Sequence, residues 1–123
     1  MTFASAVNCM DGRVQLPVIH FLKDRFGVSF IDTITEPGPN RILAVQDDPT
    51  QLSSILARLQ ISIEKHASRQ IAVVGHHDCA GNPASTEEQI SHIQKAAAFL
   101  RRKYPTAEII GIWIDQNWKI TEI

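Results

Sequence analysis

The sequence predicts an α/β fold with a sheet of about four to five strands, parallel in its core and flanked by helices. One observation is the alternation of short apolar segments with longer segments of helical spacing, in the order β-α-β-α-β-α-β. Another is the unbroken apolar run 71–74, which is typical of a strand covered on both faces. The chain of 123 residues suits one compact domain, so residues 1–123 are expected to form a single domain.

The first strand and the first helix of this prediction come from residues 3–26. The apolar run 3–8 predicts a strand whose carboxyl end carries Cys9. Apolar residues at helical spacing predict a helix over 16–26. Pro17 suits its first turn, and Gly27 suits its end.

The next segments are a second strand, a loop and a second helix. Residues 28–34 alternate in polarity and are β-branched, which favours a strand. Two prolines and a glycine in 36–40 indicate a loop. Residues 47–50 resemble a helix start, and apolar spacing predicts a helix over 51–66.

The second half of the chain repeats this alternation. Residues 70–74 predict a third strand, and 75–83 form a polar, small-residue loop. Ser85 and Glu88 suit a capping box for a helix that runs through Lys103. A fourth strand over 109–114, a turn at Asn117 and a final edge strand over 119–123 complete the sheet.

Composition and charge exclude several classes of protein. The formal net charge is −1, which gives no basic surface for nucleic acid or an anionic membrane. No segment reaches the roughly 18 apolar residues that a membrane span needs. The start of the chain lacks a basic region followed by an apolar one, so a signal peptide is not expected. We therefore expect a cytoplasmic protein. The two cysteines are then thiols or metal ligands rather than a disulfide.

Two short motifs carry the chemistry. One is Cys9-Met10-Asp11-Gly12-Arg13, and the other is Gly75-His76-His77-Asp78-Cys79-Ala80-Gly81-Asn82-Pro83. Both follow predicted parallel strands, whose carboxyl ends meet at one edge of a sheet. Thiolate and imidazole are preferred zinc ligands, and three such ligands leave a fourth position open, as in catalytic zinc sites. We expect Cys9, His76 and Cys79 to be the ligands; His77 is an alternative to His76, although the spacing favours His76.

With these motifs the chain resembles the β-class carbonic anhydrases, which carry Cys-x-Asp-x-Arg after one core strand and Gly-His-x-x-Cys-Gly after a later one. The resemblance implies that Cys9, His76 and Cys79 hold Zn²⁺. It implies that Asp11 accepts a hydrogen bond from the zinc-bound water or becomes the fourth ligand, and that Arg13 pairs with Asp11. The function it implies is that of a zinc lyase: reversible hydration of CO2 to bicarbonate by zinc-bound hydroxide. A homodimer or higher homo-oligomer is implied as well.

Other functions stay open at this point. The same site could act on COS or CS2, or the chain could be a non-catalytic, zinc-stabilised binding or regulatory protein. The cysteines could instead form a redox dithiol. His77 is expected to face solvent or to shuttle protons, and Asp78 only to solvate its loop. Asp11 and Arg13 could also form an ordinary surface ion pair without a functional role.

Overall fold

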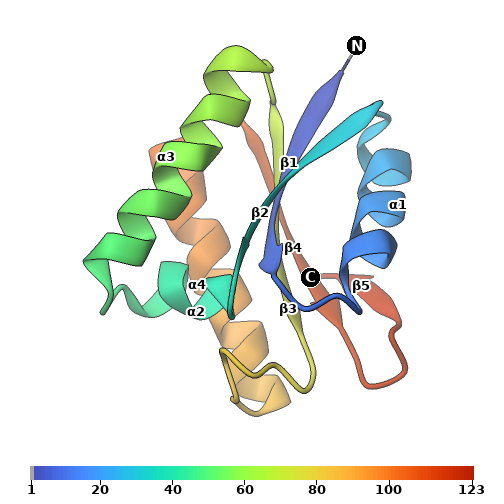
Figure 1. Cartoon of the computed structure of the whole chain (residues 1–123), viewed down its shortest axis with the longest axis vertical. Coiled ribbons are helices and arrows are strands. Elements are labelled where there is room, and N and C mark those ends of the chain that lie inside the picture. The colour runs from blue at the N-terminus through green and yellow to red at the C-terminus, as the bar shows by residue number, and fades with distance from the viewer. Residues whose placement is uncertain (1) are drawn as a thin grey trace.

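The computed structural model describes residues 2–123, and within that range five strands form one mixed sheet flanked by four helices (Figure 1). The strands are β1 (Phe3–Cys9), β2 (Phe30–Glu36), β3 (Gln70–His76), β4 (Glu108–Ile114) and β5 (Ile120–Glu122). The helices are α1 (Gln15–Phe26), α2 (Pro39–Val45), α3 (Pro49–Lys65) and α4 (Thr86–Lys103). The strand order is β2-β1-β3-β4-β5; the first four are parallel and β5 is antiparallel to β4. The predicted fold class is confirmed.

Each face of the sheet carries its own apolar core. Helix α1 covers one face, and α2, α3 and α4 cover the other (Figure 1). Along β3, Ala72 and Val74 pack in the core that contains Leu22 of α1. Val73, which points the other way, packs in the core that contains Leu59 of α3. The continuous apolar run of β3 is therefore explained by burial on both faces.

The capping residues predicted at the helix ends form the expected local contacts. The Oγ atom of Ser85 accepts a hydrogen bond from the backbone N–H of Glu88 at 3.2 Å, which caps α4. Gly27 ends α1 with a φ of 64°, the left-handed conformation that glycine tolerates best. Helix α3 begins two residues earlier than the apolar spacing predicts, because Asp48 caps it through the Gln51 N–H and proline occupies its first position.

The prediction of a loop over 36–40 is wrong at both ends. Strand β2 lies at 30–36 rather than 28–34, and helix α2 starts at Pro39. Proline presets the helical φ, and Gly38 just before it has a φ of 59°. Helix α2 persists because Ile42 and Leu43 are buried in the core shared with α3 and α4. A helix of seven residues is too short to be stable without such packing.

The carboxyl ends of the four parallel strands meet at one edge of the sheet, the lower edge in Figure 1. Strand β3 continues to His76, two residues beyond its expected end at Val74. Strands β1 and β3 are direct neighbours in the sheet, so Cys9 and His76 end adjacent strands. No helix in the described range is both long enough and apolar enough to cross a membrane.

Candidate metal centre

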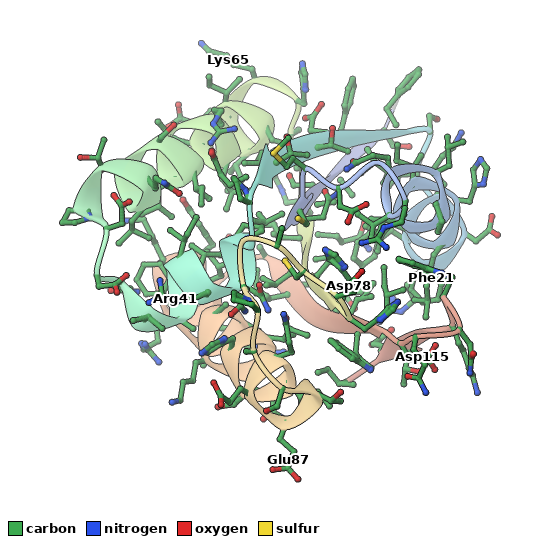
Figure 2. All side chains as sticks on the ribbon, turned by 60° about the horizontal axis from the view of Figure 1, so that its bottom comes forward. Phe21, Arg41, Lys65, Asp78, Glu87 and Asp115 are labelled. Carbon is green, nitrogen blue, oxygen red and sulfur yellow. The ribbon has the colours of Figure 1, made fainter. Side chains whose placement is uncertain are left out.

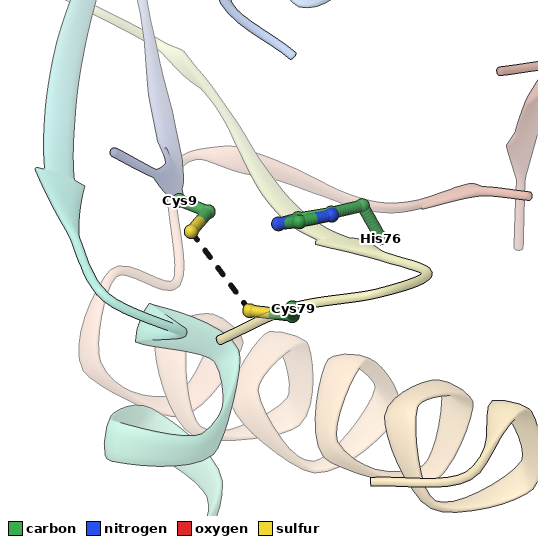
Figure 3. Close-up of side chains that lie close together, drawn as sticks. All are labelled: Cys9, His76 and Cys79. Atoms are coloured by element: carbon green, nitrogen blue, oxygen red, sulfur yellow. Dashed lines mark hydrogen bonds between the residues drawn. The ribbon is translucent and has the colours of Figure 1, made fainter. Parts of the chain in front are cut away.

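Three buried side chains converge at this edge. Cys9 is the last residue of β1, His76 is the last residue of β3, and Cys79 lies three residues further on in the loop before α4. Their exposed fractions are 5%, 1% and 5%. One ligand atom from each lies within 4.8 Å of the others, and the two Sγ atoms are 3.8 Å apart (Figure 3). The cluster could hold a metal ion.

The orientation of the His76 ring is set by its own loop. Its Nδ1 atom lies 2.7 Å from the backbone oxygen of His77. Because a carbonyl oxygen only accepts, Nδ1 carries the proton in the neutral ring, and Nε2 presents a lone pair. Nε2 is buried and has no hydrogen-bond partner within residues 2–123. A buried acceptor without a donor, next to two sulfurs, is suited to bind a cation.

The donor set fits zinc. With zinc–sulfur bonds of about 2.3 Å, two thiolates at tetrahedral corners stand about 3.8 Å apart. That spacing is the one found between the sulfurs of Cys9 and Cys79. Two sulfurs and one imidazole nitrogen are soft and intermediate ligands, which suit zinc far better than magnesium or calcium. Three protein ligands leave one position for water or substrate.

The two thiols titrate as a pair. Their mutual hydrogen bond lowers the pKa of Cys9, while burial acts in the opposite direction. The same hydrogen bond, together with burial, raises the pKa of Cys79. Burial alone would lower the pKa of His76, but the Cys9 sulfur and the His77 carbonyl favour the imidazolium and raise it. The three side chains are therefore close enough to influence one another's protonation.

Asp11 and Arg13 form the expected pair just outside the cluster. Arg13 Nε donates to Asp11 Oδ1 at 3.0 Å, and Nη2 donates to Oδ2 at 2.7 Å. The backbone N–H of Arg13 adds a third bond to Oδ1 at 2.9 Å. This guanidinium lowers the pKa of Asp11 to about 2, so the carboxylate is ionised near neutral pH. The fork geometry holds the carboxylate in one orientation.

Asp78 also contacts Arg13, which the sequence did not indicate. Its Oδ2 accepts from Arg13 Nη1 and its backbone oxygen accepts from Nη2, both at 3.2 Å. The ring of Trp118 lies 4.9 Å from the Arg13 guanidinium. Figure 2 turns this edge toward the viewer, with Asp78 near its middle. The φ of 55° at Asp78, a conformation that Asp tolerates, is the local signal that it occupies a tight turn.

A hollow of about 510 Å³ opens in front of the cluster. Its wall combines the ion-pair residues with small side chains, namely Asp11, Arg13, Asp78, Cys79, Ala80, Pro83 and Ala84. Cys79 is the one expected ligand among them, so the hollow reaches the cluster from the side of the Cys79 loop. A small, uncharged molecule has ample space there.

His77 is only partly exposed, which corrects the expectation that it faces solvent. Its ring packs edge-on against Trp118, with a centroid distance of 4.8 Å, and its Nε2 atom is buried without a partner in the described part of the chain. Trp113 is 7% exposed and packs in the interior. Trp118 is partly buried and packs against the core on the α1 face of the sheet.

An array of buried amides supports the Cys79 loop from behind. Asn40 Nδ2 donates to Gln89 Oε1 at 2.7 Å, and Gln89 Nε2 donates to the backbone oxygen of Asn82 at 2.7 Å. Asn82 Nδ2 lies 3.0 Å from Nδ1 of His92. The three amide side chains are at most 2% exposed. Sequence patterns gave no signal for their burial, because amide side chains are mostly exposed.

The turn before α2 touches the loop after β3 backbone to backbone. A Cβ atom at Gly81 would come within 2.4 Å of the Pro37 carbonyl carbon. One at Gly38 would come within 2.8 Å of the Asn82 Cβ. Only glycine fits at these two positions, and their contact brings α2 and its amide against the Cys79 loop.

Solved structures share this architecture. A β-carbonic anhydrase of the fungus Aspergillus fumigatus superposes with a TM-score of 0.67 at 15% identity, covering 100% of this chain and 90% of that one. A carbonic anhydrase from Glaciozyma antarctica gives 0.62 at 18% identity, covering 96% and 80%. A tetrameric β-carbonic anhydrase of Sordaria macrospora gives 0.55 at 12% identity, covering 98% and 79%. The fold is that of the β-carbonic anhydrases.

Sequence comparison reaches the same family. The family model described as "Putative carbonic anhydrase" matches residues 1–123, and the chain belongs to this family. A search of curated proteins found no significant match.

Proposed function

We propose that this protein is a zinc lyase that catalyses the reversible hydration of CO2 to bicarbonate, CO2 + H2O ⇌ HCO3⁻ + H⁺. Cys9, His76 and Cys79 would hold the zinc ion. The observation that supports this most strongly is the buried, unpartnered Nε2 of His76 beside two sulfurs 3.8 Å apart. Membership of the carbonic anhydrase family supports the choice of reaction.

Zinc in such a ligand set supplies acidification of water, whose pKa falls to about 7 in favourable sites. The residues of the chain do the remaining work. Asp11, held ionised by Arg13, is an acceptor only, so it can take a hydrogen bond from the attacking water and orient its lone pair toward CO2. Arg13 keeps this carboxylate in place with two donors. The hollow beside Cys79 admits CO2 and releases bicarbonate.

We further propose that the chain works as a homodimer or higher homo-oligomer. Met10 and Leu16 flank the metal-ligand loop with 62% and 64% of their surface exposed. Large apolar side chains this exposed beside a site suit contact with a second copy. A cytoplasmic location, with residues 1–123 as one domain, is part of the same proposal. Thiol ligands need a reducing compartment, because oxidation would remove them.

The test is CO2 hydration measured by stopped-flow at mildly alkaline pH, on protein whose zinc content has been determined. Asp11→Asn should lower kcat by roughly 10²-fold while zinc stays bound, because the amide offers a donor where an acceptor is needed. Asp24→Asn, an exposed aspartate on α1, is the matched control and should keep full turnover. Full turnover in Asp11→Asn would refute the role of Asp11. Sulfide release from COS or CS2 without CO2 hydration would show that COS or CS2, and not CO2, is the substrate.

A further inference from the structure

The loop between β1 and α1 has to place two groups at once, the Cys9 sulfur and the Asp11 carboxylate. Gln15, the first residue of α1, folds its side chain back under this loop. Its Nε2 donates one hydrogen bond to the backbone oxygen of Cys9 and one to the backbone oxygen of Asp11, both at 2.8 Å. A single amide group therefore ties the two residues together.

The orientation of this amide follows from its partners. Carbonyl oxygens only accept, so the NH2 group of Gln15 must face them. Its Oε1 atom faces away and accepts a hydrogen bond from Asn8 Nδ2 at 3.0 Å. Asn8 is fully buried in β1, and its Nδ2 also lies 3.2 Å from the Cys9 oxygen. The Gln15 amide is thus held by a residue of strand β1 rather than by the loop alone.

This anchoring limits how Asp11 can move. Its backbone is held by Gln15 and, through the N–H of Val14 at 3.2 Å, by the start of α1. The Asp11 carboxylate can still rotate about its side-chain bonds, between Arg13 and the cluster. A displacement of the Asp11 backbone relative to Cys9 would have to break the hydrogen bonds of the Gln15 amide, whereas a rotation of the Asp11 side chain would not.

We propose that Gln15 is a positioning residue for the metal centre: its amide sets the distance between the Cys9 ligand and the Asp11 carboxylate. This rests on the proposed zinc site and deepens it. Gln15 touches neither the metal position nor the hollow, and it acts through the two backbone oxygens.

The test compares Gln15→Met and Gln15→Glu with the wild-type protein and with Gln94→Met, an exposed control on α4. Methionine keeps the length of the side chain but lacks the donors, while glutamate keeps its shape and turns an acceptor toward two carbonyl oxygens. Zinc affinity is measured by chelator competition, and the ligand geometry by the absorption bands of the cobalt-loaded protein. We expect zinc affinity to fall about ten-fold in Gln15→Met, further in Gln15→Glu, and not at all in Gln94→Met.

A role in positioning also predicts shifted cobalt bands and a lower kcat with a nearly unchanged KM. Wild-type affinity and cobalt bands in both Gln15 variants would overturn the proposal, even if their thermal midpoints fall, because that pattern is purely structural. If the wild-type protein binds cobalt without hydrating CO2, the proposed function fails while the weaker binding of the variants still supports the role of Gln15. A wild-type protein that binds neither zinc nor cobalt would overturn both.

Discussion

Two polar clusters lie toward opposite ends of the same strands, and they differ in what they leave unpaired. Near the amino ends, the buried hydroxyl of Ser62 lies 2.6 Å from the hydroxyls of Ser5 and Ser68 and donates to Asp32 Oδ2 at 2.6 Å. His66 Nδ1 lies 2.7 Å from the same carboxylate oxygen. Every buried donor and acceptor of this serine cluster is paired within the described residues. It resembles a catalytic serine–histidine–aspartate set in composition only, because the serine bonds to the aspartate and not to the histidine.

The cluster of Cys9, His76 and Cys79 at the carboxyl ends has the opposite property, because it leaves buried polar atoms unpaired. Within residues 2–123, four buried side-chain atoms lack a partner, and three of them belong to Asn8, His76 and His77 at this edge. A closed network holds the fold together, whereas an open one marks the place of a ligand. The comparison teaches that polar residue types alone do not identify a site, and that unpaired buried atoms gathered beside potential metal ligands are a stronger indication than a single one, such as the hydroxyl of Tyr104.

The largest effect is expected from breaking the open cluster. In Cys79→Ser the remaining donors are too few to retain zinc, so bound metal should fall from about one ion per chain to near zero after dialysis. The stabilisation that excess zinc gives the wild-type protein, about 4 kcal/mol at a thousand times Kd, should disappear. Metal analysis and thermal unfolding with and without zinc measure both effects. Retention of zinc by the variant would remove Cys79 from the ligand set.

The opposite pattern is expected at the closed cluster. Ser62→Ala leaves the hydroxyls of Ser5 and Ser68 and the Asp32 carboxylate with one partner fewer in a buried site. The free energy of unfolding should drop by about 1–3 kcal/mol, with zinc content unchanged. Urea unfolding measures the drop, and Ser53→Ala on the exposed face of α3 is the control. Loss of zinc in Ser62→Ala would show that the two clusters are coupled.

A smaller, pH-dependent effect on stability is expected at His92, which contacts the buried amide of Asn82. Burial lowers the pKa of His92 below its usual 6.5, with Arg41 and Lys95 acting in the same direction and Glu88 against it. His92 therefore binds a proton more readily in the unfolded chain than in the folded one. Protonation of His92 lowers the free energy of unfolding as the pH falls through about 6.5. Between about pH 7.5 and pH 5.5, the metal-free wild-type protein should lose more unfolding free energy than His92→Gln. Parallel pH profiles for the two would contradict this.

The smallest effect is expected at Asp78. Its carboxylate bonds to Arg13 from an exposed position, with 72% of the side chain accessible, and its backbone oxygen accepts from Arg13 in any variant. Asp78→Asn should keep zinc and change kcat by less than about two-fold, since exposed ion pairs contribute little. Stopped-flow kinetics measure this. A loss as large as that expected for Asp11→Asn would make Asp78 a partner of equal importance in holding Arg13.

Much of this architecture follows from short-range patterns in the sequence. The alternation of apolar spacing predicted the parallel strands and three of the helices, and capping at Ser85 fixed the start of α4. The spacing of His76 and Cys79 allows one loop to present both, and the position of Cys9 after a strand placed it at the same edge. Periodicity failed at α2, because seven residues with a proline and glycine before them carry too little pattern.

The sequence by itself determined the residue types at the candidate metal centre and the strand ends that carry them. Only the tertiary structure decided that β1 lies beside β3, which brings two sulfurs 70 positions apart in the chain to 3.8 Å. It also decided the roles of Gln15, Asp78 and the buried amides. Their partners are backbone oxygens or residues from distant elements, and such hydrogen bonds leave no periodic trace in a sequence. Strand order and hydrogen bonding depend on contacts between distant segments, whereas helix and strand propensity depend on neighbours along the chain.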